Sequence, residues 1–212
     1  MLRILLLCTT LALPAAAQDL PAPVAGTYRL EQAHTRVLFK VNHLGFSTYI
    51  APFTGVEATL AFDPANPEAM AVTATIAADS VETLYPDPAL DFNAVIEGPE
   101  FLDAARFPQI TFTSTSVALT GPNTADVTGD LTLHGVTKPV TLAVTYNGGW
   151  GNMPMDPAGA RIGFSATGSL NRSDFGMGYG LPAPGTTMGV WDEVKIEIEA
   201  EFASKEAAVP LP

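Results

Sequence analysis

Apolar and polar side chains alternate along eight segments of the chain, each six to ten residues long. A period of two places every second side chain on the same face of a β-strand. Between 193 and 202, for example, Val194, Ile196 and Ile198 alternate with charged residues. The pattern therefore predicts eight strands with one apolar face each, over residues 36–43, 56–63, 72–77, 110–117, 126–134, 138–146, 161–170 and 193–202.

Turn-forming sequences separate these segments, and one short helix interrupts them. Asn147-Gly148-Gly149 is one such turn. The helix is predicted near 99–106, because Pro99 suits the first helical position and Glu100 suits the first turn. Since no repeat or linker divides the chain, one domain is predicted over residues 18–203, followed by a flexible tail over 204–212.

Eight antiparallel strands need an arrangement that buries all their apolar faces together. A closed barrel does this and leaves no free sheet edge. We therefore predict an all-β fold, an eight-stranded antiparallel up-and-down barrel, with a two-sheet sandwich as the alternative. A barrel of this size either fills with its own side chains or holds one slim ligand. An outer-membrane barrel is disfavoured, because short side chains such as Ala58 and Ala74 recur on the apolar faces.

The first 17 residues have the pattern of a secretory signal peptide. Arg3 precedes an apolar run from Ile4 to Leu13, and the small residues Ala15 to Ala17 suit a cleavage site. The run is too short to cross a bilayer as a helix and no other segment approaches that length, so no transmembrane span is predicted. Cleavage would also remove Cys8, the only cysteine. A buried N-terminal helix and a lipoprotein cysteine are the alternatives.

Composition and charge narrow the classes of function. The chain carries 22 acidic and 10 basic residues, a net charge of −12. Because such a surface repels phosphate backbones and anionic lipid headgroups, no nucleic-acid binding and no polybasic membrane docking is predicted. The 18 glycines and 18 prolines argue against a helical bundle.

The sequence contains few groups arranged for chemistry. His34, His43 and His134 have no ligand-type spacing, so a metal site would require the fold to bring them together. The sequence around Ser165 nearly matches a nucleophile elbow, but it lies inside an alternating strand. Because no convergent set of titratable groups is evident, neither a catalytic residue nor a metal is predicted.

Two segments outside the predicted strands are unusually apolar. One is 43–53, which includes Phe46, and the other is 175–191, which includes Met177 and Trp191. Adaptable apolar segments can form the mouth of a hydrophobic cavity. They can equally plug the end of the barrel or form a dimer contact, and the sequence leaves these alternatives open.

Four blocks of sequence carry a family resemblance over most of the chain. They are AHTRVLFKVNHLGFS at 33–47, FLDAARFPQITFTST at 101–115, VTGDLTLHGVTKPV at 127–140 and SLNRSDFG at 169–176. With these blocks the chain resembles the YceI-like family of secreted, lipocalin-like polyisoprenoid-binding proteins. The third block is the most specific, because composition alone does not produce it. The sequence LYPDPALDFNAVIEGPE, after Thr83, departs from the family pattern and leaves the shape of one cavity end open.

The resemblance implies a periplasmic, non-enzymatic binding protein that holds a long isoprenoid lipid, such as a quinone or a polyprenol, for carriage or storage. It implies no cofactor besides the bound lipid, and it allows a homodimer. Lumen positions that match the family are expected to bind the ligand: Phe39, Val41, His43, Phe46, Phe101, Phe107, Phe112, Leu131 and Leu133. His43 either hydrogen-bonds a headgroup oxygen or has a structural role. A structural barrel filled by its own side chains and an enzyme acting on a lipid are the alternatives.

Overall fold

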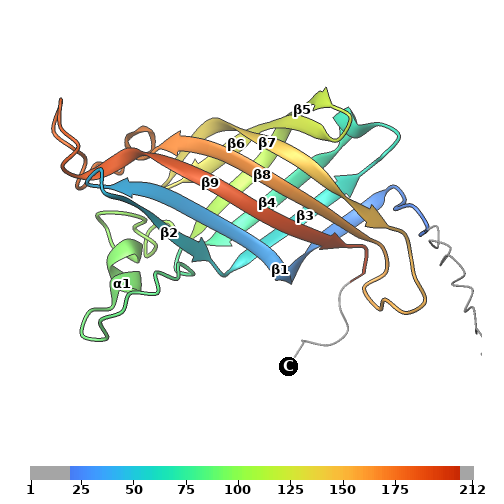
Figure 1. The fold of residues 1–212 in the computed structure, drawn as a ribbon, viewed down its shortest axis with the longest axis horizontal. Coiled ribbons are helices and arrows are strands. Elements are labelled where there is room, and N and C mark those ends of the chain that lie inside the picture. Colours follow the sequence, from blue (N-terminus) through green and yellow to red (C-terminus); the bar gives the residue numbers. More distant parts are fainter. Residues whose placement is uncertain (1–19, 206–212) are drawn as a thin grey trace, which may run out of the picture.

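The alternating segments form the strands of a sheet that closes on itself (Figure 1). The computed structural model describes residues 20–205, so the predicted signal peptide and residues 206–212 lie outside the described part. All eight predicted strands are present, and a ninth is added. Their bounds are β1 Gly26–His43, β2 Ser47–Phe53, β3 Val56–Phe62, β4 Ala71–Ala77, β5 Gln109–Gly121, β6 Thr124–Leu133, β7 Val136–Trp150, β8 Arg161–Asn171 and β9 Val190–Ala203.

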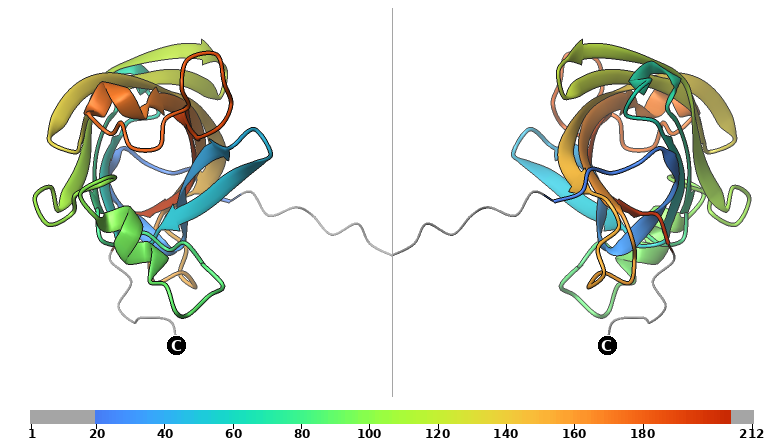
Figure 2. Two further views of the ribbon diagram at one scale, coloured as in Figure 1. Left: turned by 90° about the vertical axis from the view of Figure 1, so that its left-hand side faces the viewer. Right: turned by 90° about the vertical axis from the view of Figure 1, so that its right-hand side faces the viewer.

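The first and last strands of the chain close the barrel. From β3 to β9, each strand pairs antiparallel with the next one in the sequence. β1 then pairs with β9, from Arg29 opposite Ala203 to His43 opposite Val190. Viewed end-on, the sheet surrounds one central space (Figure 2). The predicted eight-stranded antiparallel barrel is confirmed, with β2 as an extra strand.

Residues 43–53, predicted as an apolar loop, contain the extra strand. Leu44 and Gly45 have φ values of 58° and 78°, which suit a tight hairpin turn between two twisted strands. β2 then pairs with the second half of β1, while β3 pairs with the first half. The other edge of β2 meets the rest of the protein through an isolated bridge between Phe53 and Val81.

The helix lies before the predicted range 99–106, so the predicted position of the helix was wrong. α1 spans Phe92–Glu97, and the side chain of Asp91 caps it by accepting the backbone N–H of Ala94 at 3.1 Å. Consecutive turns follow, because Asp103 adopts a φ of 46° that an α-helix does not allow. Two 3₁₀ turns complete the helical content of the described residues, Pro67–Ala69 and Arg172–Phe175. Among residues 20–205, no helix has the length and apolarity needed to cross a membrane.

The first two residues of the predicted flexible tail are held against the barrel. The backbone N–H of Ser204 donates to the carbonyl of Ala160 at 2.9 Å, and that of Lys205 donates to Ala158 at 3.0 Å. The described chain therefore continues past β9 along the loop between β7 and β8.

The end of the barrel away from α1 is filled by its own side chains. Tyr28, Phe62 and Phe202, on β1, β3 and β9, are buried there. The rings of Tyr28 and Phe62 meet edge to face with their centroids 5.5 Å apart, and Phe164 on β8 meets Phe202 at 6.1 Å. Such edge-to-face pairs are a favourable aromatic packing geometry. The packing closes one end of the barrel and leaves the other end as the place for a site.

Candidate functional site

An apolar cavity of about 560 Å³ occupies the end of the barrel that carries α1. Phe39 and Val41 on β1 line it together with Ile196 and Val194 on β9. Phe39 lies directly opposite Ile196 in the sheet register, and Val41 lies opposite Val194. Opposed residues point to the same face of a sheet, so the alternation read from the sequence builds this wall.

Helix α1 covers the side of the cavity that the sheet leaves open. Phe92 and Ile96 line the cavity from the helix, and Tyr85 lines it from the preceding loop. The ring of Phe92 packs against Tyr85 with centroids 5.0 Å apart and against Tyr49 of β2 at 6.1 Å. The sequence analysis missed these residues, although Phe92 and Ile96 have the i, i+4 spacing of one helix face.

Arg172 is the buried cation of the site. It directly follows β8, lines the cavity, and is only 5% exposed. Its guanidinium donates to the backbone carbonyls of Tyr179 at 3.1 Å, Val190 at 2.7 Å and Trp191 at 3.0 Å. Burial lowers the pKa of Arg172, and the charge of Asp192 partly offsets this effect. The side chain thereby fixes both ends of the apolar segment 176–189 beside the cavity, a role that the sequence analysis did not assign.

Few polar side chains face the cavity. Within the described residues its wall contains no carboxylate, lysine or cysteine, and its titratable side chains are His43, Tyr49, Tyr85 and Arg172. Burial raises the pKa of Tyr49, outweighing the hydrogen bond that its hydroxyl donates to the carbonyl of Thr83 at 3.1 Å. Its hydroxyl is therefore protonated at neutral pH. Because most of the wall is hydrocarbon and its few polar groups lie at one end, the arrangement favours binding of an apolar molecule.

Six of the nine predicted ligand-binding residues lie in the cavity wall. They come from β1, from the turns after α1 and from β6: Phe39, Val41, His43, Phe101, Leu131 and Leu133. The sheet brings β1 and β6 to opposite walls of one space. That a ligand contacts these six side chains stays a prediction.

Three predicted residues lie outside the cavity wall. Phe46 is 81% exposed at the tip of the β1–β2 hairpin. Phe107 packs beyond the barrel end against His134, with ring centroids 5.0 Å apart. Phe112 points into the barrel but packs over Gly129, where an added Cβ would come within 2.4 Å of its ring. These three side chains do not line the cavity, and their contact with a ligand stays a prediction. For Phe112 the family block indicates the inward face of the strand but not the depth along the barrel.

A larger hollow of about 780 Å³ lies over the polar face of β7, β8 and β9. Four of its charged side chains already form two ion pairs. The ammonium nitrogen of Lys138 lies 3.0 Å from a carboxylate oxygen of Asp174, and Lys40 pairs with Glu197. Water and these partners satisfy the exposed charges, so a ligand would gain little free energy there. The apolar cavity is the stronger candidate site.

A barrel packed at one end and hollow at the other defines a class of fold, the closed antiparallel β-barrels that enclose a cavity. The family model described as "YceI-like domain" matches residues 28–202. The chain belongs to the YceI-like family.

Bacterial relatives cover most of the chain. A UPF0312 protein of Pseudomonas savastanoi is 38% identical over 185 residues, which are 86% of this chain and 90% of that protein. Protein YceI of Salmonella arizonae is 41% identical over 154 residues, 72% of this chain and 76% of that protein.

Solved structures share the barrel. BcnA of Burkholderia cenocepacia is 26% identical with a TM-score of 0.66, over 81% of this chain and 98% of that one. The YceI protein of Campylobacter jejuni is 28% identical with a TM-score of 0.61, over 79% and 91%. A polyisoprenoid-binding domain from Saccharophagus degradans is 14% identical with a TM-score of 0.55, over 83% and 97%, and shows the likeness of fold alone.

Proposed function

We propose that the protein binds a long isoprenoid lipid, of the quinone or polyprenol type, in the cavity beside α1 and carries or stores it. The observation that carries this proposal is a cavity of about 560 Å³ with an almost entirely hydrocarbon wall. Its volume lies within the range of roughly 300–1,000 Å³ typical of small-molecule sites. An isoprenoid chain matches such a wall, because each buried CH₂ contributes about 0.8 kcal/mol and needs no hydrogen bond.

The polar groups at this end suit a single headgroup. His43 at the end of β1, Ser47 at the start of β2 and Arg172 all line the cavity. A quinone carbonyl or a polyprenyl hydroxyl or phosphate presents oxygen atoms that such donors can bind. We propose that the headgroup lies among these side chains and that the apolar chain extends inward. The role proposed is binding, without catalysis and without a further cofactor.

Native mass spectrometry of protein purified without detergent, followed by organic extraction, tests the binding role. The expected result is a mass excess of several hundred daltons that extracts as an isoprenoid. Val194→Phe narrows the cavity and is expected to reduce the bound fraction. Lys195→Phe is the control, because it adds the same ring to the adjacent residue of β9, whose side chain points to the outer face of the sheet. This variant is expected to bind the lipid as the wild type does.

A bare protein mass that is unchanged after incubation with quinones and polyprenols would overturn the binding role. The packed aromatic half of the barrel would then favour a structural protein, as the second candidate. A bound lipid that leaves chemically altered would instead point to an enzyme.

We propose a periplasmic location, because residues 1–17 have the pattern of a signal peptide. Fractionation of the producing bacterium, with N-terminal sequencing of the purified protein, tests this location. The expected product begins at Gln18 and is released with the periplasmic fraction. An uncleaved chain in the cytoplasmic fraction would contradict the proposal.

We also propose that the apolar tip beside the cavity forms a homodimer contact. Phe46 and Met188 are 81% and 65% exposed. The β1–β2 turn and the segment before β9 lie together, since the backbone N–H of Leu44 donates to Gly189 at 2.8 Å. Light scattering coupled to gel filtration is expected to give a dimer mass for the wild type and a monomer mass for Phe46→Ser. A wild-type monomer across the concentration range would overturn the dimer.

A further inference from the structure

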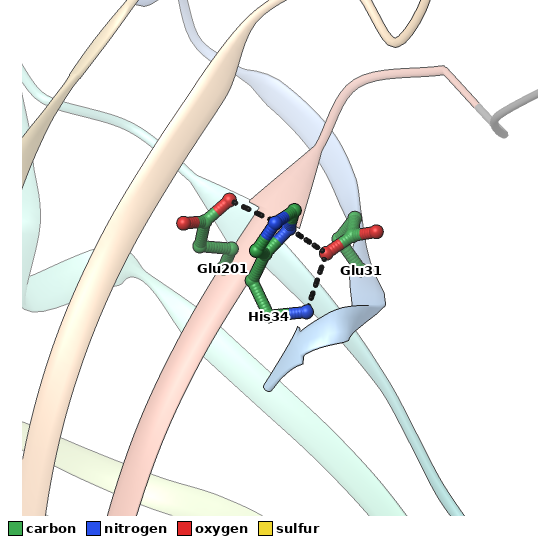
Figure 3. A group of neighbouring side chains, drawn as sticks. All are labelled: Glu31, His34 and Glu201. Carbon is green, nitrogen blue, oxygen red and sulfur yellow. Dashed lines mark hydrogen bonds and ion pairs between the residues drawn. The ribbon is translucent and has the colours of Figure 1, made fainter. Parts of the chain in front are cut away.

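Three metal-ligating side chains meet on the outer surface of the barrel, away from the cavity (Figure 3). Glu31 and His34 belong to β1, and Glu201 belongs to β9. One ligand atom of each residue lies within 4.8 Å of the other two. The imidazole Nδ1 of His34 lies 2.8 Å from Oε2 of Glu31 and 3.8 Å from Oε2 of Glu201. Sequence spacing gave no sign of this cluster, because closure of the barrel brings Glu201 to the start of the chain.

A β-bulge creates the arrangement. The pairing of β1 with β9 shifts register between Glu31 and Arg36, so the residues between them leave the ladder and one side chain is redirected. The backbone N–H of His34 donates to Oε2 of Glu31 at 2.9 Å, and the hydroxyl of Thr35 donates to the carbonyl of Glu31 at 2.7 Å. The backbone N–H of Glu201 donates to the same hydroxyl at 3.3 Å. The backbone of the bulge therefore holds the carboxylate of Glu31, and the hydroxyl of Thr35 links the bulge to β9.

The donor set identifies the class of ion. One imidazole nitrogen with two carboxylates suits a borderline cation such as Zn²⁺, whereas Mg²⁺ and Ca²⁺ prefer six or more oxygen ligands. Tetrahedral zinc with ligand bonds of about 2.0–2.2 Å places its ligand atoms about 3.3 Å apart. The observed separations of 2.8 and 3.8 Å lie on either side of this value. A fourth position would remain for water, and His34 is open to solvent as an entry path.

We propose that Glu31, His34 and Glu201 bind a Zn²⁺ ion that fastens β1 to β9 at the closure of the barrel. Arg161 is the competing cation, since its Nη1 lies 3.5 Å from Oε2 of Glu201. Its Nε also lies 2.7 Å from Asp156. Binding of Zn²⁺ would replace the 3.5 Å contact between Arg161 and Glu201, whereas the 2.7 Å contact between Arg161 and Asp156 would remain.

Calorimetric titration of the metal-free, untagged protein with Zn²⁺ tests the proposal. The expected result is one Zn²⁺ per chain and no binding of Mg²⁺. X-ray absorption at the zinc edge is expected to show nitrogen and oxygen ligands without sulfur. His34→Gln and Glu201→Gln are each expected to raise the Kd by about tenfold or more. Glu57→Gln removes an exposed carboxylate of β3 and serves as the matched control with an unchanged Kd.

Stability gives a second readout that does not depend on the size of the heat signal. Saturating Zn²⁺ is expected to raise the Tm of the wild type by about 5 °C, and to slow amide exchange around 31–36 and 199–203. Both ligand variants, checked for folding by circular dichroism, are expected to lose these effects. The proposal is overturned if the wild type binds no Zn²⁺ at millimolar concentration, or if both ligand variants bind it as tightly as the wild type.

Discussion

The guanidinium of Arg172 links the segment beside the cavity to the start of β9. It is buried and donates to three backbone carbonyls of the segment beside the cavity. Arg172→Met removes all three donors, and the three carbonyls lose their guanidinium partner. We expect the free energy of unfolding to fall by about 3 kcal/mol, measured by urea denaturation. We also expect faster amide exchange over residues 176–189.

Arg106→Met is the matched control for this prediction. Arg106 has the same charge but is 73% exposed and forms one salt bridge, with Asp103. Exposed pairs contribute about 0–1 kcal/mol, so its loss should change stability little. Equal effects of the two substitutions would contradict the anchoring role of Arg172.

Asp156 couples the stability of the protein to pH. Hydrogen bonds from Arg161, with Nε at 2.7 Å, lower the pKa of Asp156 against the opposing effect of burial. A carboxylate with a lower pKa in the folded state stabilises the fold above its unfolded pKa of 3.8. That stabilisation is lost as the pH falls through the folded pKa. Asp156→Asn should therefore be less stable than the wild type at pH 7, and the difference should shrink towards pH 2.

Asp126→Asn controls for the loss of one negative charge. Asp126 is an exposed residue of β6, and its substitution should not reproduce the pH dependence. Urea denaturation at each pH measures both variants. A difference for Asp156→Asn that stays constant across the range would contradict the coupling.

At the scale of elements, alternation in the sequence predicted the strands in which one face is apolar along the whole strand. β2 escaped prediction because Ile50 is exposed on its outer face while Ala51 is fully buried on the inner one. The first part of β1 escaped because the bulge after Glu31 interrupts its alternation. The helix was misplaced because Pro99 has the signature of a helix start, whereas the true start is the Asp91 cap. Local sequence patterns thus fail to predict an element where contacts with distant parts of the chain decide which of its side chains are exposed.

We expect the cap of α1 to affect the cavity. α1 has six residues, and a helix this short is unstable without tertiary contacts and caps. Asp91→Ala removes the acceptor for the N–H of Ala94 and should cost about 1 kcal/mol, whereas Asp91→Ser should restore most of it. Because Phe92 and Ile96 line the cavity, Asp91→Ala should also release bound lipid faster. Thermal unfolding and ligand-exchange kinetics measure the two effects, and an unchanged release rate would show that α1 does not gate the cavity.

At the scale of the molecule, the sequence predicted a closed barrel but not its division into two halves. Alternation identifies inward side chains on every strand, and it does so equally for Phe39 in the cavity wall and Phe202 in the packed end. Which inward positions meet depends on register and strand tilt, which are properties of the closed sheet. For the same reason the sequence indicated the inward face of Phe112 but not its depth in the barrel.

The depth of the cavity should set the length of the lipid it accepts. Phe112 points into the barrel and packs against the cluster that includes the cavity residues Ile110 and Leu131. Phe112→Ala removes a ring between the cavity and the packed end, so the cavity should extend inward and accept longer isoprenoids. The substitution should cost about 2 kcal/mol, less than for a fully buried ring. Native mass spectrometry after incubation with an equimolar series of polyprenols should show a shift to longer chains. Phe107→Ala removes a ring outside the cavity wall and should leave the wild-type preference, and the same preference in both variants would contradict this account of ligand length.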